Sequence, residues 1–120
     1  MNELRLGNIE ARFADIIWKY APLSTASLIK LCEEELGWKR TTTYTVLKRL
    51  SDRGIFSNED GIVKVLISKD DFYSKKTHSI VNESFGGSLP AFIASFTRGK
   101  RLSEKEIIEI EQMIERMKGK

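Results

Sequence analysis

Residues 38–54 read WKRTTTYTVLKRLSDRG, and this stretch decides the fold. As a helix it would bury one face, whose members recur at helical spacing: Thr43, Val46, Leu47 and Leu50. The opposite face would carry long cations, hydroxyl groups and one phenol: Arg40, Thr41, Tyr44, Thr45 and Lys48. No acidic residue lies between Lys39 and Leu50. Such a face suits phosphate oxygens and base edges in a DNA major groove, so we predict a helix that reads nucleic acid.

The charge of the chain is concentrated in this same stretch. The 120 residues carry a net charge of +3, which alone is weak evidence for a polyanionic partner. Residues 38–53 alone carry a surplus of +4, from five cations against the single carboxylate of Asp52: Lys39, Arg40, Lys48, Arg49 and Arg53. A basic stripe on a nearly neutral protein is the electrostatic footprint of a site.

Different roles are expected within the stripe. Lys48 and Arg49 should contact DNA phosphates, whereas hydroxyl-bearing residues should face base edges, namely Thr42, Tyr44 and Thr45. Lys39 and Arg40 could do either, and Thr41 shares the exposed face.

The segments around this stretch predict a winged helix-turn-helix domain over residues 1–67. Residues 9–20 have the pattern of an amphipathic helix that ends at Ala21-Pro22, and Ser24 is the expected N-cap of a second helix to Leu36. After the basic helix, two β-rich runs, 55–58 and 62–67, flank Asp60-Gly61 and predict a hairpin, the wing. In the wing, Lys64 and Asn58 either touch the DNA backbone or have a purely structural role.

The second half, residues 68–120, is predicted to be a helical dimerisation domain. Ser68 and Asp71 resemble a capping box that opens a helix to about Phe85, where Gly86-Gly87 stops it. A short apolar helix over residues 89–96 and a basic loop over residues 98–101 should follow. Ser103 and Glu106 then form a clear capping box for the last helix. We therefore predict a mostly α protein with a small β-hairpin wing.

Three helices of about fifty residues cannot bury that many aliphatic side chains alone, so a second copy of the chain is the expected solution. The alternative is that this half folds back on the first domain. The seam of the last helix has steps of three and four residues, as in helices that pack against helices. The expected dimerisation residues are Leu89, Phe92, Ile93, Phe96, Ile107, Ile110, Ile114 and Met117.

The sequence lacks the residues that several classes of function require. Cys32 and His78 are the sole cysteine and histidine, so neither a disulfide, a metal site nor a histidine-based catalytic set is expected, and no cofactor is predicted. Cys32 lies in line with apolar residues and should be a core side chain. We expect no enzyme, because general acid–base catalysis needs positioned groups in a pocket. Without an apolar membrane span or signal peptide, the protein should be soluble and cytoplasmic, with no membrane insertion.

The order and spacing of several short motifs resemble the penicillinase repressor family, the BlaI/MecI group of bacterial repressors with its copper-responsive CopY members. The resemblance runs from about Leu6 to Met117. It is carried by Ile16-Ile17-Trp18, Gly37-Trp38 with Thr41-Thr42, Leu47-Lys48-Arg49-Leu50, Arg53-Gly54, Phe85-Gly86-Gly87-Ser88-Leu89 and Leu102-Ser103-Glu104. It implies a winged helix followed by a helical dimerisation domain, and a homodimer that binds a palindromic operator on double-stranded DNA.

The resemblance also implies ways in which the repressor is released. The β-lactam branch is cleaved at an Asn-Phe bond through a sensor-protease pathway, and the matching bond here is Ser95-Phe96. Phe96 is therefore either half of a cleavage site or simply dimer core. The copper branch uses paired Cys-x-Cys motifs near the C-terminus, where this chain has no cysteine, so copper sensing of that type is not expected.

Two further alternatives remain open. One is a winged-helix regulator of another stress, metal or transporter operon, released by a signal other than proteolysis. The other is a winged helix used only for protein contacts, since a fold alone does not fix a function.

Overall fold

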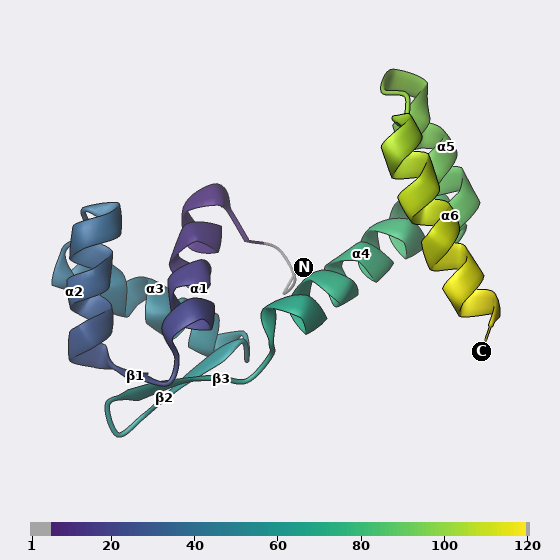
Figure 1. Cartoon of the computed structure of the whole chain (residues 1–120). Coiled ribbons are helices and arrows are strands. Elements are labelled where there is room, and N and C mark those ends of the chain that lie inside the picture. Colours follow the sequence, from purple (N-terminus) through teal and green to yellow (C-terminus); the bar gives the residue numbers. More distant parts are fainter. Residues whose placement is uncertain (1–5, 120) are drawn as a thin grey trace. The chain divides into compact units, whose positions relative to one another are not determined.

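The computed structural model describes residues 6–119, which form six helices and a three-stranded sheet (Figure 1). The elements in chain order are α1 (Asn8–Tyr20), β1 (Leu23–Ser24), α2 (Thr25–Leu36), α3 (Arg40–Asp52), β2 (Phe56–Glu59), β3 (Ile62–Val65), α4 (Lys69–Phe85), α5 (Leu89–Gly99) and α6 (Glu104–Lys118). The chain divides into two compact units, Met1–Thr77 and His78–Lys120. No helix of the described residues is both long and apolar enough to cross a membrane.

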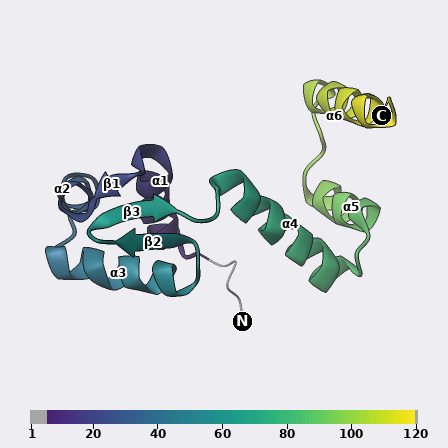
Figure 2. The ribbon, with the colours of Figure 1, turned by 90° about the horizontal axis from the view of Figure 1, so that it is seen from below.

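The first unit is a winged helix. Its strands lie in the order β1-β3-β2 and all pair antiparallel; Figure 2 shows the β2–β3 hairpin beside α3. At the hairpin tip, Asp60 and Gly61 have φ values of 54° and 78°, the two positive values that a tight type I′ turn requires. The predicted hairpin and the mostly helical fold class are confirmed.

Strand β1 was not expected from the sequence. It has two residues, and Leu23 pairs with Val63 about forty positions further along the chain. A run this short has no detectable periodicity, so its pairing with β3 could not be predicted from the local sequence and depends on the folded hairpin.

The core of the first unit joins all three of its first helices to the sheet. It includes the whole predicted inner face of α3, because Thr43, Val46, Leu47 and Leu50 are each at most 7% exposed. Cys32 is fully buried in the same core, as expected, and burial raises the pKa of its thiol. A buried thiol of this kind behaves as a small apolar side chain.

Trp18 connects α1 to the wing and to the start of α4. Its ring packs against three aromatic rings, Phe56, Phe72 and Tyr73, at centroid distances of 5.5, 5.7 and 6.0 Å. Its indole Nε1 donates a hydrogen bond of 3.0 Å to the carbonyl oxygen of Ile67. Phe72 is fully buried in the first unit's core, so the first turn of α4 is part of that unit.

The two units divide between Thr77 and His78, ten residues beyond the domain boundary expected at residues 67 and 68. As a boundary between functional domains, the division 1–67 and 68–120 stays a prediction.

The ends of helices α4 and α6 follow the predicted signals. The Ser68 hydroxyl accepts a hydrogen bond from the Asp71 amide at the start of α4, and Ser103 and Glu106 form the predicted capping box of α6. Gly86 and Gly87 have φ values of 58° and 83°, which explains why α4 stops there.

The prediction of a loop over residues 98–101 is partly wrong. Helix α5 continues through Arg98 to Gly99, and the connector to α6 comprises residues 100–103. The Thr97 hydroxyl donates to the Ile93 carbonyl at 2.9 Å within this helix, and Arg is a good helix former, so the turn before Gly99 stays helical.

The role of Phe72 predicts how truncation affects stability. A fragment ending at Thr77 should unfold at clearly higher urea concentration than one ending at Ile67, because the shorter fragment lacks Phe72 and exposes its cavity. The Phe72→Ala substitution in the full chain should cost about 3–5 kcal/mol of unfolding free energy, measured by tryptophan fluorescence in urea. Equal stability of the two fragments would show that α4 does not belong to the first core.

Candidate nucleic-acid interface

The outer face of α3 is exposed along its whole length. All nine predicted DNA-contact residues are exposed: Lys39, Arg40, Thr41, Thr42, Tyr44, Thr45, Lys48, Arg49 and Lys64. Because the inner face of α3 is buried in the core, the members of this set that belong to α3 lie on its solvent-exposed side. The helix itself begins at Arg40, with Lys39 as its extended N-cap residue.

A short turn fixes the angle at which α3 leaves α2. Gly37 ends α2 in the left-handed conformation at φ 69°, where a residue without Cβ is favoured. The ring of Trp38 then stacks on Phe13 of α1 with centroids 5.3 Å apart. Arg12 of α1 donates a hydrogen bond of 3.2 Å to the Glu35 carbonyl. Both ends of the turn are therefore held by α1, which gives α3 a defined orientation.

Local contacts organise the polar groups on the outer face. The Thr45 hydroxyl donates to the Thr41 carbonyl at 2.9 Å, so its oxygen can still accept, for example from the amino group of adenine or cytosine. The Arg40 guanidinium lies 5.7 Å from the centre of the Tyr44 ring, within cation–π range. Lys48 pairs with Asp52 at 3.1 Å, but both side chains are mostly exposed, so this pair is easily exchanged for a phosphate.

The wing contributes differently at its two candidate residues. Asn58 of β2 lines a hollow of about 350 Å³ together with four residues of α3, namely Tyr44, Leu47, Lys48 and Ser51. Lys64 of β3 instead pairs with Glu59 at 3.3 Å and lines a separate hollow beside Ala21 and Pro22. The structure thus brings Asn58 to the outer edge of α3 and does not bring Lys64 there.

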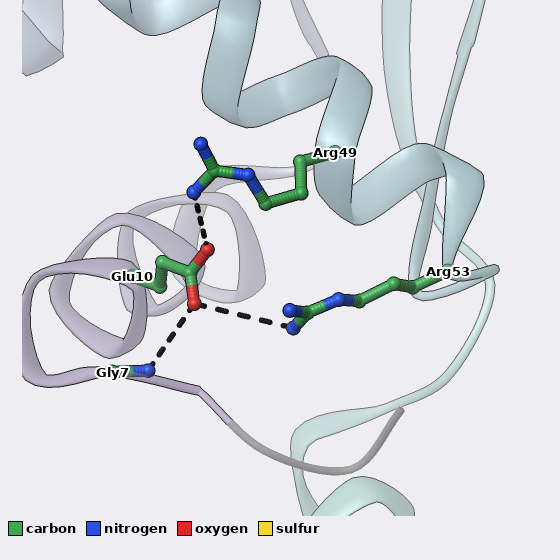
Figure 3. Close-up of polar contacts among 4 residues, drawn as sticks. All are labelled: Gly7, Glu10, Arg49 and Arg53. Atoms are coloured by element: carbon green, nitrogen blue, oxygen red, sulfur yellow. Dashed lines mark hydrogen bonds and ion pairs between the residues drawn. The ribbon is translucent and has the colours of Figure 1, made fainter. Parts of the chain in front are cut away.

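Arg49 has a partner that the sequence did not suggest. Its Nη1 donates to Oε2 of Glu10 at 2.7 Å, and Nη1 of Arg53 lies 4.0 Å from the other carboxylate oxygen (Figure 3). The same Oε1 accepts a 3.2 Å hydrogen bond from the Gly7 amide at the start of α1. One carboxylate therefore joins the beginning of α1 to the end of α3.

The charge state of Glu10 follows from these contacts. Burial raises its pKa, but the hydrogen bonds from Arg49 and the Gly7 amide, with the positive charges of Arg53 and Arg49, outweigh that effect. The pKa is lowered from its usual value of 4.5. Helical periodicity alone assigns Glu10 merely to the polar side of α1. The available signal was its position three residues after Gly7, the spacing of a capping box.

Most of the expected dimerisation residues are exposed in the single chain. Leu89, Ile93, Phe96, Ile107, Ile114 and Met117 are 41–67% exposed, while Phe92 and Ile110 are half-buried. The Phe92 ring contacts Phe85 edge-on with centroids 5.6 Å apart. Among residues 78–119, no side chain is fully buried. The Ser95-Phe96 bond lies within helix α5. Both side chains are exposed, but the peptide bond itself is part of the helical backbone.

The described residues show no group of three or more His, Cys, Asp or Glu side chains placed to hold a metal ion.

The first unit has three helices, of which the third presents a basic outer face, followed by a β-hairpin. These features define it as the winged helix-turn-helix of a DNA-binding regulator.

Comparison with known families makes the identification narrower. The model of the penicillinase repressor family matches residues 6–116, and the chain belongs to this family. It is 28% identical to the penicillinase repressor of Bacillus licheniformis, in an alignment that covers 97% of this chain and 94% of that protein. The chain is thus a transcriptional repressor by family.

The Glu10 contacts predict a pH-dependent contribution to stability. Since the pKa of Glu10 is lower in the folded chain than in the unfolded one, its contribution is complete above about pH 4.5 and is lost as the pH falls through the folded-state pKa. The Glu10→Gln variant should be less stable than the natural chain by about 1 kcal/mol at pH 7, a value typical of partly exposed pairs. In urea titrations this difference should shrink on acidification below pH 4.5. A difference that grows on acidification would contradict the assignment.

Proposed function

We propose that this chain represses transcription in the cytoplasm by binding a palindromic operator on double-stranded DNA as a homodimer, and that the operator controls a resistance operon of the β-lactam type. The observation that carries the proposal is the two-faced α3, with its inner side chains at most 7% exposed and its outer face basic and hydroxyl-rich. The name of the Bacillus licheniformis relative supports the choice of operon.

Docking of α3 into the major groove uses its outer residues for two purposes. Lys48 and Arg49 neutralise phosphates, which positions the helix but reads no sequence. Tyr44, Thr45 and Thr42 face base edges, while Lys39, Arg40 and Thr41 lie where the helix enters the groove. Asn58, which lines the hollow between α3 and the wing, reaches the flanking backbone.

The homodimer is proposed from the exposed apolar side chains of the second unit. A large apolar surface left in water marks an interaction site, and the regular spacing of Ile107, Ile110, Ile114 and Met117 suits a helical partner. An isologous dimer places two winged helices about a two-fold axis, which a palindromic operator mirrors. Two linked weak half-site contacts then give one tight complex.

Release is proposed to follow from loss of the last helix. A cut between residue 95 and residue 103 would detach α6 with its isoleucine seam and leave two poorly binding monomers. Within that segment the connector over residues 100–103 is non-helical, and all of its residues are exposed except Leu102, which is half-buried. Cleavage of the Ser95-Phe96 bond, by contrast, requires helix α5 to open locally. Release of the repressor from DNA without any cleavage would point instead to a signal other than proteolysis, or to a regulator of another operon.

Substitutions on α3 should separate positioning from reading. Lys48→Ala should weaken binding to every duplex and lower the salt slope by about one unit, since one phosphate contact is lost. Thr45→Ala should cost about 1–3 kcal/mol on a selected operator and little on random DNA. Fluorescence anisotropy at several salt concentrations measures both. Equal losses on both kinds of DNA for Thr45→Ala would exclude its reading role.

Substitutions on α6 test the dimer. Ile114→Ser, on the seam, should shift sedimentation of the full chain at micromolar concentration from dimer to monomer and weaken operator binding in parallel. The matched control is Ile108→Ser, which changes an isoleucine of similar exposure off the seam, 52% against 47%. A natural chain that sediments as a monomer, or an Ile114→Ser variant that remains dimeric, would contradict the proposed interface.

A further inference from the structure

Glu10 makes contacts beyond what capping α1 requires. The N–H groups at the start of a helix lack partners within the helix, and Oε1 of Glu10 accepts a hydrogen bond from one amide at this end, that of Gly7, at 3.2 Å. The other oxygen, Oε2, accepts from Arg49 at 2.7 Å, and Arg53 lies 4.0 Å from Oε1. The Glu10 side chain is only 16% exposed, so its carboxylate is held in one place between two helices.

Arg49 is only partly used by this contact. Its side chain is 49% exposed, and Figure 3 shows its second terminal nitrogen pointing away from Glu10. In the sequence Arg49 follows Lys48 of the outer face and precedes Leu50 of the core, so it lies at the edge of the proposed DNA-binding face. A guanidinium can bind a carboxylate on one side and still donate to a phosphate from its other N–H groups.

We infer that Glu10 is a positioning residue for DNA binding, which orients Arg49 so that its free N–H groups meet a DNA phosphate. The inference rests on the proposed function, because it takes α3 as the helix that enters the groove. A free arginine side chain loses rotamer freedom when it is fixed on a phosphate. Glu10 fixes most of that side chain before DNA arrives, so binding loses less entropy.

Simple electrostatics predicts the opposite sign. A carboxylate near DNA repels phosphates, so removing its negative charge should strengthen binding if Glu10 had no positioning role. Asp15 provides the matched control, because it lies on the same helix α1 and is also paired with a cation, Lys69 at 3.0 Å. Asp15→Asn makes the same change of charge without touching Arg49.

The experiment uses the full chain and a random-sequence duplex of about 30 base pairs, since a phosphate contact does not depend on sequence. Glu10→Gln should weaken binding about fivefold and lower the salt slope by about one unit, as Arg49→Gln should. Asp15→Asn should bind as tightly as the natural chain or tighter, with an unchanged slope. The double variant Glu10→Gln with Arg49→Gln should bind no more weakly than Arg49→Gln alone.

Two outcomes would overturn the inference. One is a Glu10→Gln variant that binds as tightly as the natural chain or tighter. The other is a further loss when Glu10→Gln is added to Arg49→Gln, which would mean that Glu10 acts through the fold and not through Arg49. All variants are compared below their thermal unfolding transitions. If Glu10→Gln does not fold, Glu10→Asp, which keeps the charge but withdraws it from Arg49, should show the same loss of slope.

Failure of the inference and failure of the proposed function are distinguishable. If the natural chain binds no duplex even at low salt, the proposed function is wrong and the role of Glu10 fails with it. If the natural chain binds and the Glu10 variants match it, only the positioning role is wrong.

Discussion

Burial of one face of α3 against α1, α2 and the sheet is the constraint on which the rest of the structure depends. Thr43, Val46, Leu47 and Leu50 are at most 7% exposed, so the helix cannot rotate about its axis without moving apolar groups into water. This packing turns the basic and hydroxyl-bearing side chains outward as a set. The stacked Trp38 and Phe13 rings and the Glu10 contacts hold the two ends of the same helix. Rigid support of this kind is what a recognition surface needs.

The two units bury their apolar side chains in different ways. The first closes a core around Phe13, Phe56 and Phe72, with Trp18 packed against the latter two and tied by its indole nitrogen to the Ile67 carbonyl. The second leaves many of its large apolar side chains between 41% and 67% exposed, with Met117 the most exposed at 67%. Helix ends there are still well formed, through the Ser88 and Ser103 caps. Local signals thus define the helices of the second unit, whereas many of their large apolar side chains stay uncovered in the single chain, which is the basis of the proposed homodimer.

The features that could be predicted from the sequence depend on residues close together in the chain. Helical spacing predicted both faces of α3, Asp60-Gly61 predicted the hairpin, and the Ser103 capping box predicted the start of α6. Features that depend on distant contacts could not be found this way. Strand β1 exists because Leu23 meets Val63. Phe72 joins a core whose other buried members lie between residues 13 and 63, and Glu10 meets Arg49 across 39 positions. The candidate site was therefore predicted as a set of exposed side chains, but not the contacts that orient them.

The most direct test of the central claim is to sequence the duplexes that the full chain selects from a random pool. If the outer faces of two α3 helices read DNA about a two-fold axis, the selected sequences should contain an inverted repeat with half-site centres about one helical turn, or a multiple of it, apart. Loss of selection in the Thr45→Ala variant, with retained binding to all duplexes, would locate the reading in α3. Recovery of a single unrepeated motif, or of no enriched sequence at all, would contradict a dimeric operator-binding repressor.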